Sequence, residues 1–105
     1  MHQLVVLYPQ PDSPEAFLEY YKSKHLKLVE RLPGLLTYRY GVVQPLGPDS
    51  PGNFLVFEAV FASQGALLAA LDSDVGKAIV ADVPNYSPKG HALLHFNVMT
   101  PHSER

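Results

Sequence analysis

Hydrophobic residues follow a strand-like pattern in four segments of the chain. Residues 4–8 form a continuous apolar run rich in β-branched side chains, which is typical of a buried central strand, and Pro9 ends it. Residues 35–43 and 54–61 are rich in β-branched and aromatic side chains, and the prolines and glycines between them exclude regular structure there. With residues 92–98 as the last segment, the pattern predicts four strands, of which the middle two form a hairpin with a long loop.

Two other regions follow the period of an amphipathic helix and carry residues that begin and end helices. Ser13 begins the first helix, with a proline directly after it at the first helical position, and the Pro-Gly pair at 33–34 ends it. The second region has two parts. Residues 64–71 form one helix, and the serine and aspartate at 73–74 begin another, which ends near Pro84.

The predicted order of elements, β-α-β-β-α-β, is the split βαβ arrangement, which places both helical regions on one face of a four-stranded antiparallel sheet. In residues 54–61 both alternating sets of side chains are largely apolar, whereas a sheet with one face in water shows apolar and polar residues in turn. We therefore expect a second copy of the chain to cover the open face, which gives a homodimer packed sheet to sheet. The alternative is that these are ordinary strand residues on a partly exposed surface.

Composition indicates one globular domain that has no attraction to polyanions. The 105 residues are 47% hydrophobic and 17% charged, which predicts a single domain over residues 1–105. The formal net charge of -2 at pH 7 gives no attraction to nucleic acid or to anionic membranes. No run approaches the about 18 apolar residues of a membrane helix, and the N-terminal apolar stretch lacks the features of a secretory signal. We therefore expect a cytoplasmic protein that binds neither nucleic acid nor membranes.

Each helical region carries one ionisable residue on its apolar face. On a projection of about 100° per residue, His25 lies near the centre of the first apolar arc and Asp82 lies on the inward side of the last helix. The residues that share the two arcs are Phe17, Leu18, Tyr21, Leu28, Val29 and Leu32 on the first, and Val75, Ala78, Ile79, Val83 and Tyr86 on the second. An unpaired carboxylate is costly to bury, so Asp82 is expected to meet a cation, a hydrogen-bond donor or water, and His25 is an available partner.

If His25 and Asp82 meet, the pair suits general acid–base catalysis. The carboxylate fixes the imidazole tautomer and raises its pKa, whereas apolar surroundings lower that pKa, which leaves it near neutrality, where proton transfer is efficient. These two residues are the catalytic candidates. The candidates for contact with a ligand are aromatic: Tyr21, Tyr38, Phe57 and Tyr86.

Each candidate has a structural alternative. A histidine on an apolar helix face is often a core residue whose hydrogen bonds are satisfied. Asp82 lies near the end of its helix and can accept hydrogen bonds from loop amides around Asn85 and Tyr86. Alternating tyrosines such as Tyr38 and Tyr40 are typical of a strand face.

The sequence contains no pattern for a metal or a bound cofactor. It has no cysteine, and His91 and His95 on the last strand lie too far apart for a compact metal site without a further ligand. There is no H-E-x-x-H motif, no Gly-rich phosphate loop, no G-x-S-x-G motif and no dinucleotide fingerprint. We therefore expect no metal and no cofactor.

From residue 4 to about residue 98, the chain resembles the EthD family. The most specific matches are paired aromatic residues followed by a histidine on the first helix, the Pro-Gly helix end, and a late aspartate followed by an aromatic residue. In this chain they are Tyr20, Tyr21, His25, Pro33, Gly34, Asp82 and Tyr86. The family often has a proline two residues after this histidine. Here Lys27 stands at that position, which predicts a straighter first helix.

The resemblance implies the dimeric α+β barrel fold, in which two ferredoxin-like sheets pack together and each subunit keeps a cleft between its helices and its sheet. It makes His25 and Asp82 the site candidates by position, with Tyr21 and Tyr86 beside them. The family takes its name from a gene cluster that degrades a fuel ether. Relatives in fold include muconolactone isomerases, cofactor-free polyketide cyclases, quinone-forming monooxygenases and haem-degrading enzymes.

The expected function is therefore isomerisation, cyclisation or a related acid–base step on a small hydrophobic or aromatic compound, without a cofactor. One alternative is a non-catalytic dimer that binds a ligand or accompanies an oxidative degradation system. Another is a protein that binds haem through His25.

Overall fold

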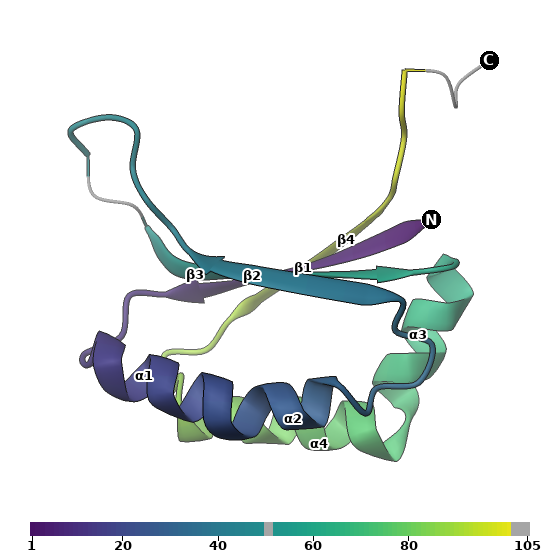
Figure 1. Ribbon diagram of the computed structural model, residues 1–105, viewed down its shortest axis with the longest axis horizontal. Coiled ribbons are helices and arrows are strands. Elements are labelled where there is room, and N and C mark those ends of the chain that lie inside the picture. The colour runs from purple at the N-terminus through teal and green to yellow at the C-terminus, as the bar shows by residue number, and fades with distance from the viewer. Residues whose placement is uncertain (50–51, 102–105) are drawn as a thin grey trace.

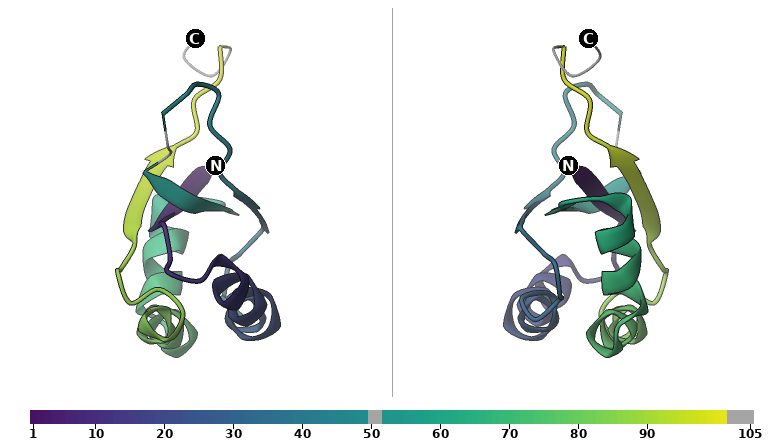
Figure 2. Two further views of the ribbon diagram at one scale, coloured as in Figure 1. Left: turned by 90° about the vertical axis from the view of Figure 1, so that its left-hand side faces the viewer. Right: turned by 90° about the vertical axis from the view of Figure 1, so that its right-hand side faces the viewer.

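The computed structural model has two layers, a four-stranded antiparallel sheet and a set of helices on one of its faces (Figure 1). It describes residues 1–49 and 52–101, so residues 50 and 51 of the expected long loop lie outside the described residues. The strands are β1 (His2–Pro9), β2 (Thr37–Val42), β3 (Asn53–Phe61) and β4 (Ala92–Asn97), in the spatial order β2-β3-β1-β4. Views from the two ends show all the helices on the same side of the sheet (Figure 2). The predicted fold class is confirmed.

Strand β1 lies inside the sheet, as its apolar sequence predicts. It is antiparallel to β3 on one side and to β4 on the other. The residues of β1 that face the helices are buried, and they are His2, Leu4, Val6 and Tyr8. Tyr8 lies near the end of the strand, where its ring packs against Phe17 of the first helix.

The first helical region is not the regular helix that the sequence predicts. It consists of α1 (Pro14–Tyr20), a π-helical segment η1 (Tyr21–His25) and α2 (Leu26–Val29). At the end of η1 the N–H of Leu26 donates to the carbonyl of Tyr21, five residues earlier. The wider turn ends at His25, two residues before Lys27, so the helical region continues past this position without a break but is not α-helical throughout.

The π-helical turn has a physical reason in the spacing of the buried residues. The apolar face repeats every four residues, at Phe17, Tyr21, His25 and Val29, whereas an α-helix has about 3.6 residues per turn, so residues four apart drift around it. A wider turn holds more residues and corrects this drift. All four side chains are 3% exposed or less.

The second helical region begins at the residues that the sequence predicts. Helix α3 (Gln64–Asp72) is capped by Ser63, and α4 (Asp74–Asp82) is capped by Ser73. A short 3-10 helix, η2 (Val83–Asn85), continues α4 and leads to Tyr86. Within residues 1–49 and 52–101, every helix is too short or too polar to cross a membrane.

The face of the sheet away from the helices is largely apolar, and we call it the open face. Its apolar residues are Val5, Leu7, Val56, Val60, Leu94 and Phe96. An ion pair between Arg39 Nε and Glu58 Oε1, at 2.6 Å, lies on the same face. Leu94 and Phe96 on β4 are 52% and 48% exposed in the single chain. A single chain therefore leaves large apolar side chains of β4 in contact with water.

Candidate active site

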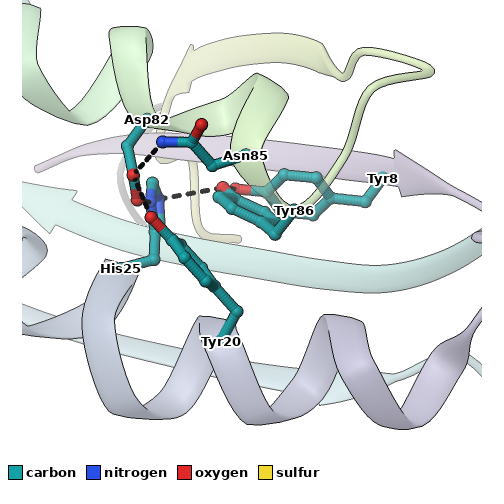
Figure 3. A network of polar contacts seen from close by, with 6 residues as sticks. All are labelled: Tyr8, Tyr20, His25, Asp82, Asn85 and Tyr86. Carbon is teal, nitrogen blue, oxygen red and sulfur yellow. Dashed lines mark hydrogen bonds and ion pairs between the residues drawn. The ribbon is translucent and has the colours of Figure 1, made fainter.

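The two ionisable residues of the apolar helix faces meet beneath the sheet (Figure 3). His25, at the end of η1, and Asp82, at the end of α4, approach with Nδ1 and Oδ2 at 3.0 Å. The histidine side chain is 2% exposed and the aspartate side chain is 12% exposed. The π-helical turn directs His25 inward, and the length of α4 places Asp82 opposite it.

Two further donors hold the carboxylate of Asp82. The hydroxyl of Tyr20 donates to Oδ1 at 2.6 Å, and the side-chain amide of Asn85 donates to the same oxygen at 2.9 Å. Burial raises the pKa of this carboxyl, but the hydrogen bonds from Tyr20, Asn85 and His25 outweigh burial and hold the pKa below its usual value. Asp82 is therefore ionised at neutral pH and accepts hydrogen bonds only.

His25 is neutral in this environment. Burial lowers the pKa of its imidazole, and this effect exceeds the opposite effect of Asp82. Because the Asp82 carboxylate accepts at Nδ1, the single ring proton lies on Nδ1 and leaves Nε2 as an acceptor. The Tyr86 hydroxyl lies 3.0 Å from Nε2, and the Tyr8 hydroxyl lies 2.9 Å from the Tyr86 oxygen. Figure 3 shows this series of contacts as one connected chain.

An apolar cleft lies between the sheet and the helices, next to His25. Its free volume is about 50 Å³, and its lining includes Tyr8, Tyr21, His25, Phe57, His91 and Leu93. The Tyr21 ring stacks on His25 with centroids 5.2 Å apart and planes at 26°. The hydroxyl of Tyr21 is buried, and no described residue forms a hydrogen bond with it. We call this space the inner cleft.

A second, more open pocket of about 340 Å³ lies between the segment after β1 and the segment after η2. Tyr20, Asn85 and Tyr86 line this outer pocket together with polar residues such as Lys89. The Tyr86 hydroxyl bonds to two residues of the inner cleft, so Tyr86 links the two spaces.

A family model described as the EthD domain matches residues 10–90 of the chain. The chain belongs to the EthD family. An uncharacterised 11.0 kDa relative of this EthD chain, from the thcB-thcC intergenic region of Rhodococcus erythropolis, is 30% identical over 94 residues, which covers 90% of this chain and 91% of the relative.

Solved structures show the same fold. An EthD family protein from Bacillus halodurans is 27% identical with a TM-score of 0.87, covering 94% of this chain and 99% of that one. A dimeric ferredoxin-like protein of unknown function from Thermobifida fusca is 18% identical with a TM-score of 0.69, covering 92% and 90% of the two chains. This EthD chain therefore has the ferredoxin-like fold of the dimeric α+β barrel proteins.

The structure of this EthD chain brings most of the candidate residues together. Tyr21 and Phe57 line the inner cleft, and Tyr86 bonds to His25. Tyr38 does not join them: its hydroxyl donates to Glu30 Oε2 at 3.2 Å, and its ring stacks on the Phe57 ring.

Three residues of the EthD site were not among the candidates. Asn85 follows Asp82 by three residues, a helical spacing that predicts contact and could have indicated it. Tyr20 precedes the π-helical turn and lies outside the arc of a regular helix, so helical periodicity gave no signal for it. Tyr8 is the last aromatic residue of a strand, and nothing in the sequence indicates its contact with Tyr86.

A haem iron or a metal ion could approach His25 only at Nε2, where the Tyr86 hydroxyl now lies. Its ligation would displace Tyr86, whereas Asp82 at Nδ1 would remain as the partner that orients the ring. His95 Nδ1 bonds to His2 Nε2 at 2.8 Å instead of facing His91. Among the residues that the structure describes, no three histidine, aspartate or glutamate side chains gather as metal ligands would.

Proposed function

We propose that this EthD protein is a small cytoplasmic enzyme that transfers a proton on a small hydrophobic or aromatic compound, without a cofactor, as in an isomerisation or a cyclisation. The observation that carries the proposal is the buried Tyr86–His25–Asp82 hydrogen-bonded chain beside an apolar cleft. His25 accepts and returns the proton. Asp82 orients its ring.

Electrostatics support these roles. A neutral His25 can accept a proton at Nε2, and the ionised Asp82 then stabilises the imidazolium at Nδ1. Tyr20 and Asn85 keep the carboxylate charged, so the proton stays on His25 and does not move to Asp82. π-helical turns are rare and are frequent at functional sites, which agrees with the one that ends at His25.

We further propose that the protein is a homodimer that pairs through the open face. The apolar residues of this face suit sheet-on-sheet packing with a second copy, and the self-complementary arrangement of a two-fold dimer would cover all of them at once. The ferredoxin-like protein from Thermobifida fusca is described as dimeric, which supports the same arrangement here.

The experiment uses 2-tetralone, a hydrophobic cyclic ketone with exchangeable protons next to its carbonyl. Exchange of these protons in D₂O is followed by NMR with the wild type, with His25→Gln and with His95→Gln as a matched control on β4. The wild type and the control should accelerate exchange, and His25→Gln should lose about 100-fold or more of the acceleration. Circular dichroism checks that each variant is folded.

Unchanged exchange in folded His25→Gln would contradict the catalytic role of His25. A non-catalytic function is the second candidate, because the Tyr86 hydroxyl covers Nε2 and separates it from a ligand. If the wild type binds 2-tetralone without accelerating exchange, that second function holds and the enzyme proposal is wrong.

A further inference from the structure

The hydrogen bonds around His25 have a fixed direction. Asp82 accepts at Nδ1–H of His25, so Nε2 has no proton and must accept from Tyr86. The Tyr86 oxygen then accepts a hydrogen bond from the Tyr8 hydroxyl. In this series Tyr8 donates to Tyr86, Tyr86 donates to His25, and His25 donates to Asp82. The oxygen of Tyr8 can therefore still accept a hydrogen bond from another donor.

Tyr8, the last member of this hydrogen-bonded series, lies in the inner cleft near a hydroxyl that has no hydrogen bond to a described residue. Tyr8 and Tyr21 both line the inner cleft, and the Tyr21 hydroxyl is fully buried without a bond to any described residue. Buried polar groups almost always have a partner, so such an exception calls for an explanation. The cleft thus presents an acceptor, the Tyr8 oxygen, and a donor, the Tyr21 hydroxyl. The two lie close enough to influence each other's pKa, but they form no hydrogen bond of ordinary geometry.

A hydroxyl group satisfies both, because it donates one hydrogen bond and accepts others. We propose that the inner cleft binds a compound that carries a hydroxyl group on a hydrophobic ring, and that Tyr8 is the catalytic residue that touches it. The proposal rests on the function proposed above and changes the way in which His25 acts. The ligand hydroxyl donates to Tyr8 and accepts from Tyr21, and His25 receives the proton through Tyr86.

The proton transfer balances without any other reactant. The O–H bond of the ligand breaks and its proton moves to the oxygen of Tyr8, the proton of Tyr8 moves to Tyr86, and the proton of Tyr86 moves to Nε2 of His25. The products are a ligand oxyanion that accepts from Tyr8 and Tyr21, and an imidazolium that faces Asp82. Burial raises the pKa of Tyr8 and of Tyr86, so these hydroxyls pass protons on and do not remain ionised.

The ring of the ligand needs more space than the inner cleft offers in the unliganded chain. Its free volume is about 50 Å³. Val80 and Leu93 line the cleft and are 45% and 47% exposed, so their side chains can move outward to admit a ring. The apolar lining then selects a hydrophobic ring, and the two hydroxyls select its polar group.

The test compares 4-nitrophenol with nitrobenzene, which lacks the hydroxyl. Binding is measured by equilibrium dialysis, and absorbance reports the fraction of bound 4-nitrophenol that is ionised. The variants are Tyr8→Phe and Tyr21→Phe, which keep the ring and remove the hydroxyl. Tyr38→Phe is the matched control, since that hydroxyl bonds to Glu30 outside the cleft.

The wild type and Tyr38→Phe should bind 4-nitrophenol about tenfold or more tightly than nitrobenzene and should increase its ionised fraction. Tyr8→Phe should lose that increase and most of the preference while still binding nitrobenzene. Tyr21→Phe should lose most of the preference. Equal binding of the two probes by the wild type, or full retention of the ionised fraction in Tyr8→Phe, would overturn the proposal.

The two proposals fail in different ways. If His25→Gln abolishes exchange of 2-tetralone while Tyr8→Phe leaves the 4-nitrophenol signals unchanged, His25 is the base and the Tyr8 relay is wrong. If Tyr8→Phe abolishes those signals and the wild type accelerates no exchange, the cleft binds and ionises phenols but the enzyme proposal is wrong.

Discussion

The buried hydroxyl of Tyr21 lowers the stability of the unliganded fold and suits the binding of a ligand. Its ring is packed between Tyr8, Phe17 and His25, whereas its oxygen has no partner among the residues the structure describes. The ring contacts stabilise the fold and the buried oxygen destabilises it. A residue that is kept at such a cost fits a site in which a ligand supplies the missing bond.

Replacing this tyrosine by phenylalanine should therefore stabilise the unliganded protein. The expected gain in the free energy of unfolding is about 1 kcal/mol, because Tyr21→Phe removes a buried hydroxyl that has no hydrogen bond. Urea unfolding measures the gain. Tyr38→Phe should change the same quantity by less than about 0.5 kcal/mol, since it removes a surface contact with Glu30. A loss of stability in Tyr21→Phe would show that the hydroxyl is bonded.

The lowered pKa of His25 predicts how stability depends on pH. Burial places the pKa of the folded imidazole below the unfolded value of 6.5, so the unfolded chain binds more protons in the interval between the two values. The stability that neutral His25 contributes is fully present above pH 6.5 and is lost as the pH falls toward the lowered pKa.

Urea unfolding at about pH 7.5 and about pH 5 tests this dependence. The wild type should lose more stability than His25→Gln over that interval, and the comparison cancels the contribution of His2, whose pKa is also lowered by burial. Equal losses in the two proteins would show that His25 has an ordinary pKa when folded.

At the scale of residues, the sequence predicts the inward direction of the His25 and Asp82 side chains, because helical periodicity encodes direction. It does not predict the partners that lie on other elements. Tyr8 and Tyr86 are separated by 78 positions, and no periodic pattern relates residues across such a distance. Tyr38, a candidate for contact with a ligand, bonds through its hydroxyl to Glu30 and stacks its ring on Phe57, as its structural alternative on a strand face allows.

At the scale of elements, caps and breakers predict where helices begin, and they leave the internal geometry undetermined. Ser13, Ser63 and Ser73 each cap a helix as their sequence context indicates. Caps and breakers do not predict the π-helical turn, because it depends on which side chains must reach the core. Its cause is the four-residue spacing of the buried side chains Phe17, Tyr21, His25 and Val29, which the structure reveals.

The junction of α3 and α4 depends on one glycine. A Cβ on Gly76 would overlap the carbonyl oxygens of Ala70 and Leu71, which belong to the backbone and cannot give way. Gly76→Ala should therefore lower the free energy of unfolding by about 2 kcal/mol or more, as measured in urea. It should also weaken the contact of Asp82 with His25, because α4 carries Asp82.

Gly65→Ala is the control for this prediction. A Cβ at Gly65 would meet Ser63 Oγ at an ordinary 3.8 Å, and the position lies in the first turn of α3. Alanine favours helix over glycine, so this variant should be unchanged or slightly more stable, by up to about 1 kcal/mol. Similar losses in the two variants would show that the packing of α4 against α3 is not the cause.

At the scale of the whole molecule, the order of the elements predicts the sheet and the side on which the helices lie. The order of the elements does not determine whether a second copy of the chain covers the open face. Leu94→Glu should keep the fold, since Leu94 is half exposed in the single chain, and should convert a dimer into a monomer by burying a charge at the pairing surface. Sedimentation measures the mass.

Leu68→Glu serves as the matched control for the substitution on the open face. Leu68 is 50% exposed on α3, away from the open face, so this variant should sediment like the wild type. A wild-type mass equal to that of one chain would show that the homodimer proposal is wrong.

Strand β4 bears on how a ligand reaches the inner cleft. All six of its residues are exposed, its hydrogen-bonded neighbour is β1, and its residue Leu93 lines the cleft. An element with so little buried surface separates from its neighbour by local fluctuation far more readily than the chain unfolds, so amide hydrogens of β4 should exchange with solvent faster than those of β3. A partner on Leu94 and Phe96 would slow that exchange. Dimerisation would then set the rate at which the site fills.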